Sequence, residues 1–170
     1  MINIKKKLSF VYKNLVRKLF KIFYGNIFFL FNRKYSSNVD IFEINSSIIC
    51  HTDKKKYLIY KIKNGRISTD FVENVAVLDG NRIINKASYQ QVKGNLRIAK
   101  FNSVIKNGTP YFKKKFNGRV LSITQGASGH SNYFHWMFDI LPKIKLYSEK
   151  FDFKDLDFLY ASKLLNYQKK

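Results

Sequence analysis

The sequence predicts a fold of the α/β class with an α+β-looking arrangement, in which a helix and a series of short strands precede a second helix. Apolar residues recur at helical spacing near the N-terminus. Short β-like segments separated by turn residues fill the middle of the chain, and residues 132–147 return to a helical pattern. With 45% apolar residues in 170, the chain has enough material for one packed domain.

The N-terminal arm, residues 1–38, is a basic amphipathic segment. Residues Met1 to Tyr35 carry nine basic side chains and no acidic one. The apolar positions that recur at helical spacing are Leu8, Val11, Tyr12, Leu15, Leu19, Ile22 and Phe23. Two interpretations stay open: an anchor on an anionic membrane surface, or a terminal helix packed on the domain. The apolar stretch is too short to span a bilayer, and no signal-peptide pattern follows.

Residues 39–170 form the predicted main domain, which begins with short strands. The predicted strands are 40–49, 57–62, 75–78, 82–84, 96–104 and 119–124. Asp79-Gly80 between two of them is a hairpin turn, because this pair tolerates the positive φ angles of a tight turn. Cys50 is the only cysteine, which excludes an internal disulfide and fits a reducing, cytoplasmic location. An anchored arm would place the chain on the inner face of the membrane.

The net charge of +21 suggests a polyanionic partner, but its composition argues against nucleic acid. Of the 32 basic residues, 26 are Lys and only 6 are Arg. Proteins that read bases and phosphates favour Arg, whose planar group binds in a bidentate manner. The chain is also rich in Asn, Ile, Phe and Tyr, which AT-rich codons specify together with Lys. We therefore expect no nucleic-acid partner.

The residues with the clearest chemistry follow the strand at 119–124. A loop of small residues, 126–131, leads into the helix at 132–147, with Ser131 or Asn132 as its N-cap. His135 and Asp139 are four residues apart and share one helix face, so the carboxylate can orient the imidazole as a general base requires. A structural His–Asp pair would have the same spacing. Pro142 is predicted to kink or end the helix, and the side chains predicted to pack toward the core are Phe134, Met137, Phe138 and Leu141.

The segment Asn132-Tyr-Phe-His-Trp-Met-Phe-Asp-Ile-Leu-Pro142, with the small-residue loop before it, resembles the signature of glycosyltransferase family 61. Bacterial members of that family are often labelled capsular polysaccharide biosynthesis proteins. The resemblance is strong over residues 119–144 and weaker back to residue 39. It implies the acceptor-side half of an inverting, GT-B-like enzyme that acts in surface polysaccharide synthesis. The base would be Asp139 or His135, Asn132 would hold the loop–helix junction or contact the acceptor, and further site-lining residues would be His130 and Ser128.

The resemblance also sets expectations about ligands. The partners would be a glycan acceptor and a nucleotide-sugar donor, the donor bound by a Rossmann-like C-terminal domain that this sequence does not contain. We therefore expect a truncated chain that binds no cofactor or metal and is inactive alone. The alternative is a non-catalytic basic module that binds a membrane surface or nucleic acid. A zinc hydrolase built on His130, His135 and Asp139 is disfavoured, because the spacing is not that of a His-Glu-x-x-His site.

Overall fold

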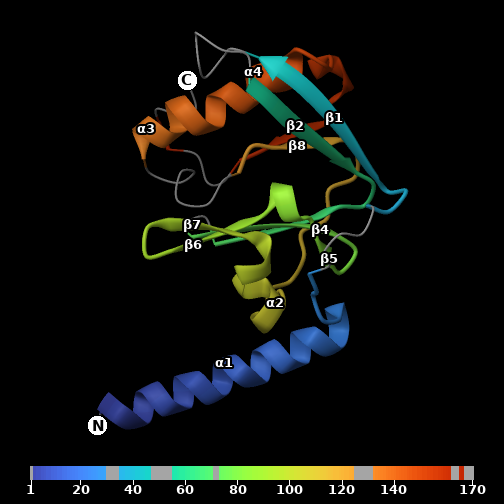
Figure 1. The fold of residues 1–170 in the computed structure, drawn as a ribbon. Coiled ribbons are helices and arrows are strands. Elements are labelled where there is room, and N and C mark those ends of the chain that lie inside the picture. Colours follow the sequence, from blue (N-terminus) through green and yellow to red (C-terminus); the bar gives the residue numbers. More distant parts are fainter. Residues whose placement is uncertain are drawn as a thin grey trace.

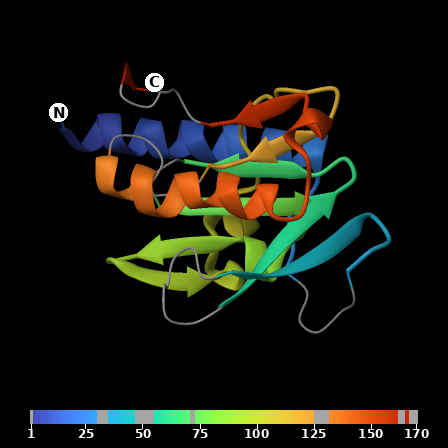
Figure 2. The ribbon, with the colours of Figure 1, turned by 90° about the horizontal axis from the view of Figure 1, so that it is seen from above.

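The computed structural model describes residues 2–29, 35–46, 55–70, 73–124, 132–161 and 165–166. These residues form a mixed α+β fold with three groups of strands and two long helical segments, and the larger sheet lies between the helical segments (Figure 1). Helix α1 (Ile2–Tyr24) lies on one side of the strands. A continuous helical segment, Tyr133–Ser148, lies on the other side (Figure 1 and Figure 2).

Two antiparallel sheets make up the middle of the chain. Strands β1 (Val39–Ser46) and β2 (Lys55–Ile62) pair over their whole length. The larger sheet has the order β3 (Arg66–Thr69), β4 (Asn74–Asp79), β6 (Tyr89–Val92), β7 (Asn95–Ile98), with β5 (Arg82–Ile83) beside β4. Gly80 has φ of 57° in the β4–β5 turn, as the Asp-Gly pair predicts.

The larger sheet carries one of the two hydrophobic clusters. Ala76, Leu78 and Ile83 from the sheet are buried with Ile27 from the segment after α1, and with Ala99 and Val104. Ile27 is joined to the sheet by its neighbour Phe28, whose backbone N–H donates to Asn81 and whose carbonyl accepts from Ile83. The end of the N-terminal arm therefore contributes to the core of the sheet.

The predicted strand at 96–104 is wrong in its second half. Strand β7 ends at Ile98, a 3₁₀ turn covers Ala99–Phe101, and helix α2 spans Ser103–Asn107. Asn102 is the cause, because its amide accepts from the backbone N–H of Val104 at 3.1 Å and caps α2. The same amide donates to the carbonyls of Val75 and Tyr89, which ties the start of α2 to strands β4 and β6.

The last part of the described chain is a β-α-β unit. Strand β8 (Val120–Ser122) pairs in parallel with β9 (Phe158–Tyr160). The helical segment between them comprises α3 (Tyr133–His135), a π-helical turn (Trp136–Ile140) and α4 (Leu141–Ser148). The described residues contain this one parallel pair and no Rossmann domain.

Of the two outcomes predicted for Pro142, a kink or an end of the helix, the second is wrong, because the helix continues past it. The N–H of Leu141 bonds to the carbonyl of Trp136, which is five residues earlier and defines the π turn. This wider turn ends directly before α4, so Pro142 lies in the first turn of a new α-helical segment. A residue without a backbone N–H is tolerated there, and the helix continues to Ser148.

Of the predicted core face of this helix, Leu141 is confirmed, because it packs against the second hydrophobic cluster. The other predicted core residues are exposed: Phe134, Met137 and Phe138. Trp136 and Ile140 are buried, and they pack with Ile123 just beyond β8. Phe134 and Phe138 are 61% and 60% exposed. Two faces of this helix carry large apolar residues, so periodicity alone does not predict which face is buried. The buried face is the one that packs against β8 and the residue after it.

Candidate functional site

The predicted His–Asp pair forms on the helix that follows β8. Nδ1 of His135 lies 2.6 Å from Oδ2 of Asp139, and the two side chains are 35% and 38% exposed. The short distance is typical of a hydrogen bond in which one partner is ionised. The bond fixes the imidazole ring and engages one of its nitrogens and one carboxylate oxygen. Such a pair can hold a base in place while both residues remain accessible to a ligand.

Asn132 has the structural part of its predicted role. Its side-chain oxygen accepts from the backbone N–H of His135 at 3.4 Å, which makes Asn132 the N-cap of α3. The N-cap holds the first turn of the helix at the start of the His–Asp face. Ser128 and His130, the other predicted site-lining residues, lie outside the described residues, as does the loop 126–131. The zinc interpretation depends on His130 and so also falls outside them.

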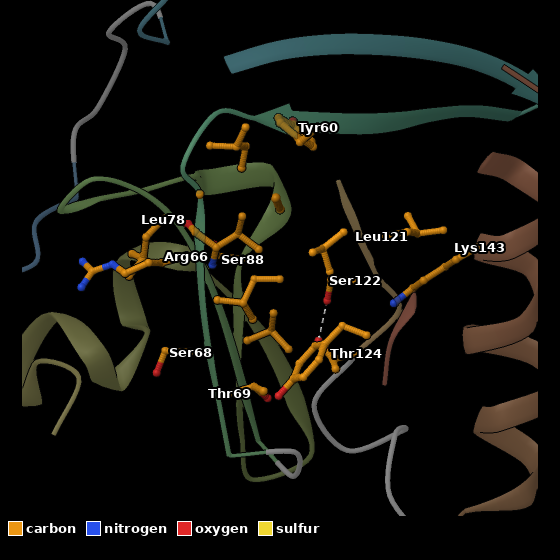
Figure 3. Close-up of a pocket in the computed structure, with 18 of the residues that line it drawn as sticks. Tyr60, Arg66, Ser68, Thr69, Leu78, Ser88, Leu121, Ser122, Thr124 and Lys143 are labelled. Carbon is orange, nitrogen blue, oxygen red and sulfur yellow. Dashed lines mark hydrogen bonds between the residues drawn. The ribbon is translucent and has the colours of Figure 1, made fainter. Parts of the chain in front are cut away.

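A broad cleft separates the larger sheet from β8 and α4 (Figure 3). Asp139 is among the residues that line it. Polar residues that line it come from both sides: Arg66, Ser88, Ser122, Thr124, Asp139 and Lys143. His135 lies one helical turn before Asp139 and is bonded to it. Asp139 is the member of the pair that is among the residues lining the cleft.

Lys143 is a further charged residue that lines the cleft. Its side chain extends from α4 toward the segment that carries Ser122 and Thr124 (Figure 3). Burial lowers the pKa of Lys143 to about 8, and the nearby carboxylate of Asp139 opposes this shift. The signal was present in the sequence, because His135, Asp139 and Lys143 follow one another at intervals of four residues on one helix face.

Two hydroxyl groups lie on the same side of the cleft as Lys143, on the segment toward which its side chain extends (Figure 3). Oγ of Ser122 and Oγ1 of Thr124 are 2.9 Å apart, and either can be the donor. They lie at the carboxyl end of β8, the edge at which ligands bind in sheets of parallel strands. Hydroxyls, a carboxylate and an ammonium group thus converge on one part of the cleft.

An exposed aromatic pair borders the same part of the helix. The rings of Phe134 and Phe138 lie 4.7 Å apart at 36°, and Phe138 lines the cleft. The ring of Phe134 also meets the ring of His135 edge-on, with centroids 5.7 Å apart. Sequence reasoning missed this pair because it placed both residues in the core. Aromatic walls with a few directed polar groups are typical of small-molecule sites.

Arg66 also lines the cleft on the sheet side, with its guanidinium turned away from Lys143 (Figure 3). The Arg66 guanidinium donates to the carbonyl of Gly80 at 2.7 Å and to Oδ1 of Asn81 at 2.8 Å. The ammonium of Lys113 lies 3.9 Å from the ring centre of Tyr24. Burial lowers the pKa of both groups, and the charge of Arg66 lowers the pKa of Lys113 further. Two neighbouring cations suit an anionic ligand better than a neutral one.

The chain matches no family model, no curated protein and no solved structure. The likeness to glycosyltransferase family 61 therefore rests on the motif residues alone. Within the described residues, no helix is both long enough and apolar enough to cross a bilayer.

Proposed function

We propose that this chain is the acceptor-side part of an inverting glycosyltransferase, which moves a sugar from a nucleotide-sugar donor to a hydroxyl group of a glycan acceptor in surface polysaccharide synthesis. The observation that carries the proposal is the 2.6 Å bond between His135 and Asp139, with Asp139 in the wall of the cleft. The motif that contains both residues resembles the family signature. The donor would be held by a further Rossmann-like domain.

The position of the pair favours Asp139 as the base and His135 as a positioning residue. Asp139 lines the cleft and would take the proton of the acceptor hydroxyl. The acceptor oxygen then forms a bond to the anomeric carbon of the donor, the bond from that carbon to the nucleotide phosphate breaks, and a nucleoside diphosphate leaves. His135 fixes the carboxylate through Nδ1, and the ammonium of Lys143 keeps a positive charge beside it.

The aromatic pair supports a saccharide as the acceptor. The C–H face of a sugar ring is apolar and packs on an aromatic ring, while its hydroxyls need polar partners. Phe138 provides such a ring in the cleft, and Ser122 and Thr124 provide hydroxyl groups that line the same cleft. The basic groups on the sheet side, Arg66 and Lys113, suit a phosphate carried by a ligand.

A transfer assay tests the proposal. The chain is reunited with the separate donor-binding domain that the proposal requires, and this reunited protein is used for every transfer rate below. It is incubated with uridine, guanosine and cytidine diphosphate sugars and a set of octyl glycosides, and products are detected by mass spectrometry. We expect one donor–acceptor pair to yield product, and Asp139→Asn to lower the rate by about 10²- to 10⁴-fold. The matched control is Glu43→Gln, which removes a carboxylate from an exposed 2.6 Å ion pair with Lys56. Equal rates for Asp139→Asn, His135→Ala and the control would reject the assignment.

The second candidate is a non-catalytic basic module that binds a membrane surface or a polyanion. The net charge of +21 favours it. It predicts salt-sensitive binding that is the same in Asp139→Asn and in the unmodified chain, with no product from any donor.

A further inference from the structure

Helix α1 has its apolar face turned away from the rest of the molecule. The apolar residues spaced by three or four positions along it are all between 49% and 80% exposed: Ile4, Leu8, Val11, Leu15, Leu19 and Ile22. Tyr12 and Phe23 widen this face and are also exposed. A helix of 23 residues is about 35 Å long, so the apolar face extends far along one side of the molecule.

The opposite face of α1 makes the contacts with the body. The ring of Phe20 meets that of Phe112 with centroids 5.2 Å apart. Nζ of Lys21 donates to the carbonyl of Lys106 in α2 at 2.7 Å, and Lys113 lies over the ring of Tyr24. These contacts all come from the C-terminal turns of the helix, beside α2 (Figure 1). The helix therefore contacts the body through a face that is not its main apolar one. A terminal helix packed on a core would contact the body through its apolar face instead.

Charge indicates what covers the apolar face. Residues 2–24 contain seven basic side chains and no acidic one. At 100° per residue, Lys7 and Lys18 lie along one margin of the apolar face and Lys5 along the other. A second copy of the helix would bring like charges together without an acidic partner, which disfavours a helix pair. A surface with an apolar interior and anionic groups at its boundary complements both the face and its margins.

We infer that α1 is an interfacial membrane anchor, whose apolar face inserts into an anionic bilayer surface while Lys5, Lys7 and Lys18 meet the phosphate groups. The helix would lie in the plane of the interface. In Figure 1, α1 and the helical segment that carries Asp139 lie on opposite sides of the larger sheet. The inference is independent of the proposed transferase chemistry, since no described residue of α1 lines the cleft.

Vesicle co-sedimentation of the whole chain tests the inference. Vesicles contain either phosphatidylcholine alone or phosphatidylcholine with one third phosphatidylglycerol. At low salt, we expect the chain to bind the anionic vesicles and not the phosphatidylcholine vesicles. The affinity for the anionic vesicles should fall on the order of a hundredfold in Leu8→Ser/Leu15→Ser. The matched control, Leu96→Ser/Ile98→Ser, removes similar exposed apolar residues from β7 and should bind normally. Neutralising Lys5, Lys7 and Lys18 to Gln should also weaken binding on the order of a hundredfold.

Two results would overturn the inference. One is equal binding by the Leu8→Ser/Leu15→Ser variant and its β7 control, which would assign the lipid affinity to overall charge. The other is a chain that binds neither kind of vesicle and forms a dimer in solution, while the Leu8→Ser/Leu15→Ser variant is a monomer, as measured by light scattering. That result would assign the face to a second copy. Because the substituted side chains are exposed, circular dichroism should show the same helix content in all variants.

Discussion

The larger sheet and the β8–α4 unit use polar side chains in opposite ways. In the sheet, Asp79 is nearly buried and accepts from Ser36 at 2.6 Å, Asn38 at 3.5 Å and Arg82 at 2.6 Å. Asn102 is likewise buried and bridges β4, β6 and α2. In the β8–α4 unit, the members of the His135–Asp139 pair are each more than one-third exposed, beside a cleft.

This difference separates groups that hold the fold from groups that can do chemistry. Removing a partner from a buried polar group costs the desolvation of whatever is left unpaired, so such groups stabilise one structure. A partly exposed pair adds little to stability because water can replace either partner. Substitutions in the sheet should therefore change stability, and substitutions beside the cleft should change ligand binding and rate.

The largest effect on stability is expected for Asp79→Asn. The Ser36 hydroxyl, with Asn38 and Arg82, holds the pKa of Asp79 below its usual value. The unfolded chain therefore binds this proton more readily, so the carboxylate stabilises the fold above about pH 4 and loses that effect as the pH falls further. We expect Asp79→Asn to lower the free energy of unfolding at pH 7 by about 2 kcal/mol, measured by urea denaturation.

The control for this prediction is Glu43→Gln, whose exposed ion pair should contribute less than about 1 kcal/mol. If both variants unfolded at the same urea concentration, the distinction between buried and exposed polar groups in this chain would fail.

A smaller effect, on binding alone, is expected for Phe138→Ala. The ring is 60% exposed and lines the cleft, so its loss should change the free energy of unfolding by less than about 0.5 kcal/mol. The apparent KM for the glycan acceptor should rise by up to about tenfold with little change in kcat. Phe101→Ala, an exposed ring on the 3₁₀ turn after β7, serves as the control. A fall in stability without a change in KM would assign Phe138 to packing.

A further effect, which depends on pH, is expected for Lys143. Because burial lowers its pKa to about 8, the unfolded chain binds more protons at this lysine between that pH and about 10.4. Stability contributed by this group should therefore rise with pH across that window. Lys143→Met should remove the rise, whereas Lys145→Met on the exposed side of α4 should keep it. Denaturation curves at pH 7, 9 and 10 compare the two, and identical pH profiles would contradict the buried placement of Lys143.

Local patterns in the sequence predicted the secondary structure better than the packing. The Asp79-Gly80 hairpin, helix α1 and the His135–Asp139 face each depend on neighbouring residues, and each is present in the structure. The end of β7 at Ile98 depends on bonds from Asn102 to distant carbonyls, which no local pattern contains. The apolar residues of α1 and the rings of Phe134 and Phe138 face outward because of how each helix packs on the rest of the molecule. Periodicity could identify these apolar faces, but it could not predict whether they point toward the core or toward solvent.

The most direct test of the catalytic proposal is a double-mutant cycle on the transfer rate for His135→Ala and Asp139→Asn. If His135 acts only by positioning Asp139, the double variant should transfer sugar at the rate of Asp139→Asn alone, since one lost function cannot be lost twice. All three variants should keep the stability of the unmodified chain to within about 1 kcal/mol. Rate losses that multiply in the double variant, or that vanish when compared per folded molecule, would contradict a catalytic His–Asp unit at this cleft.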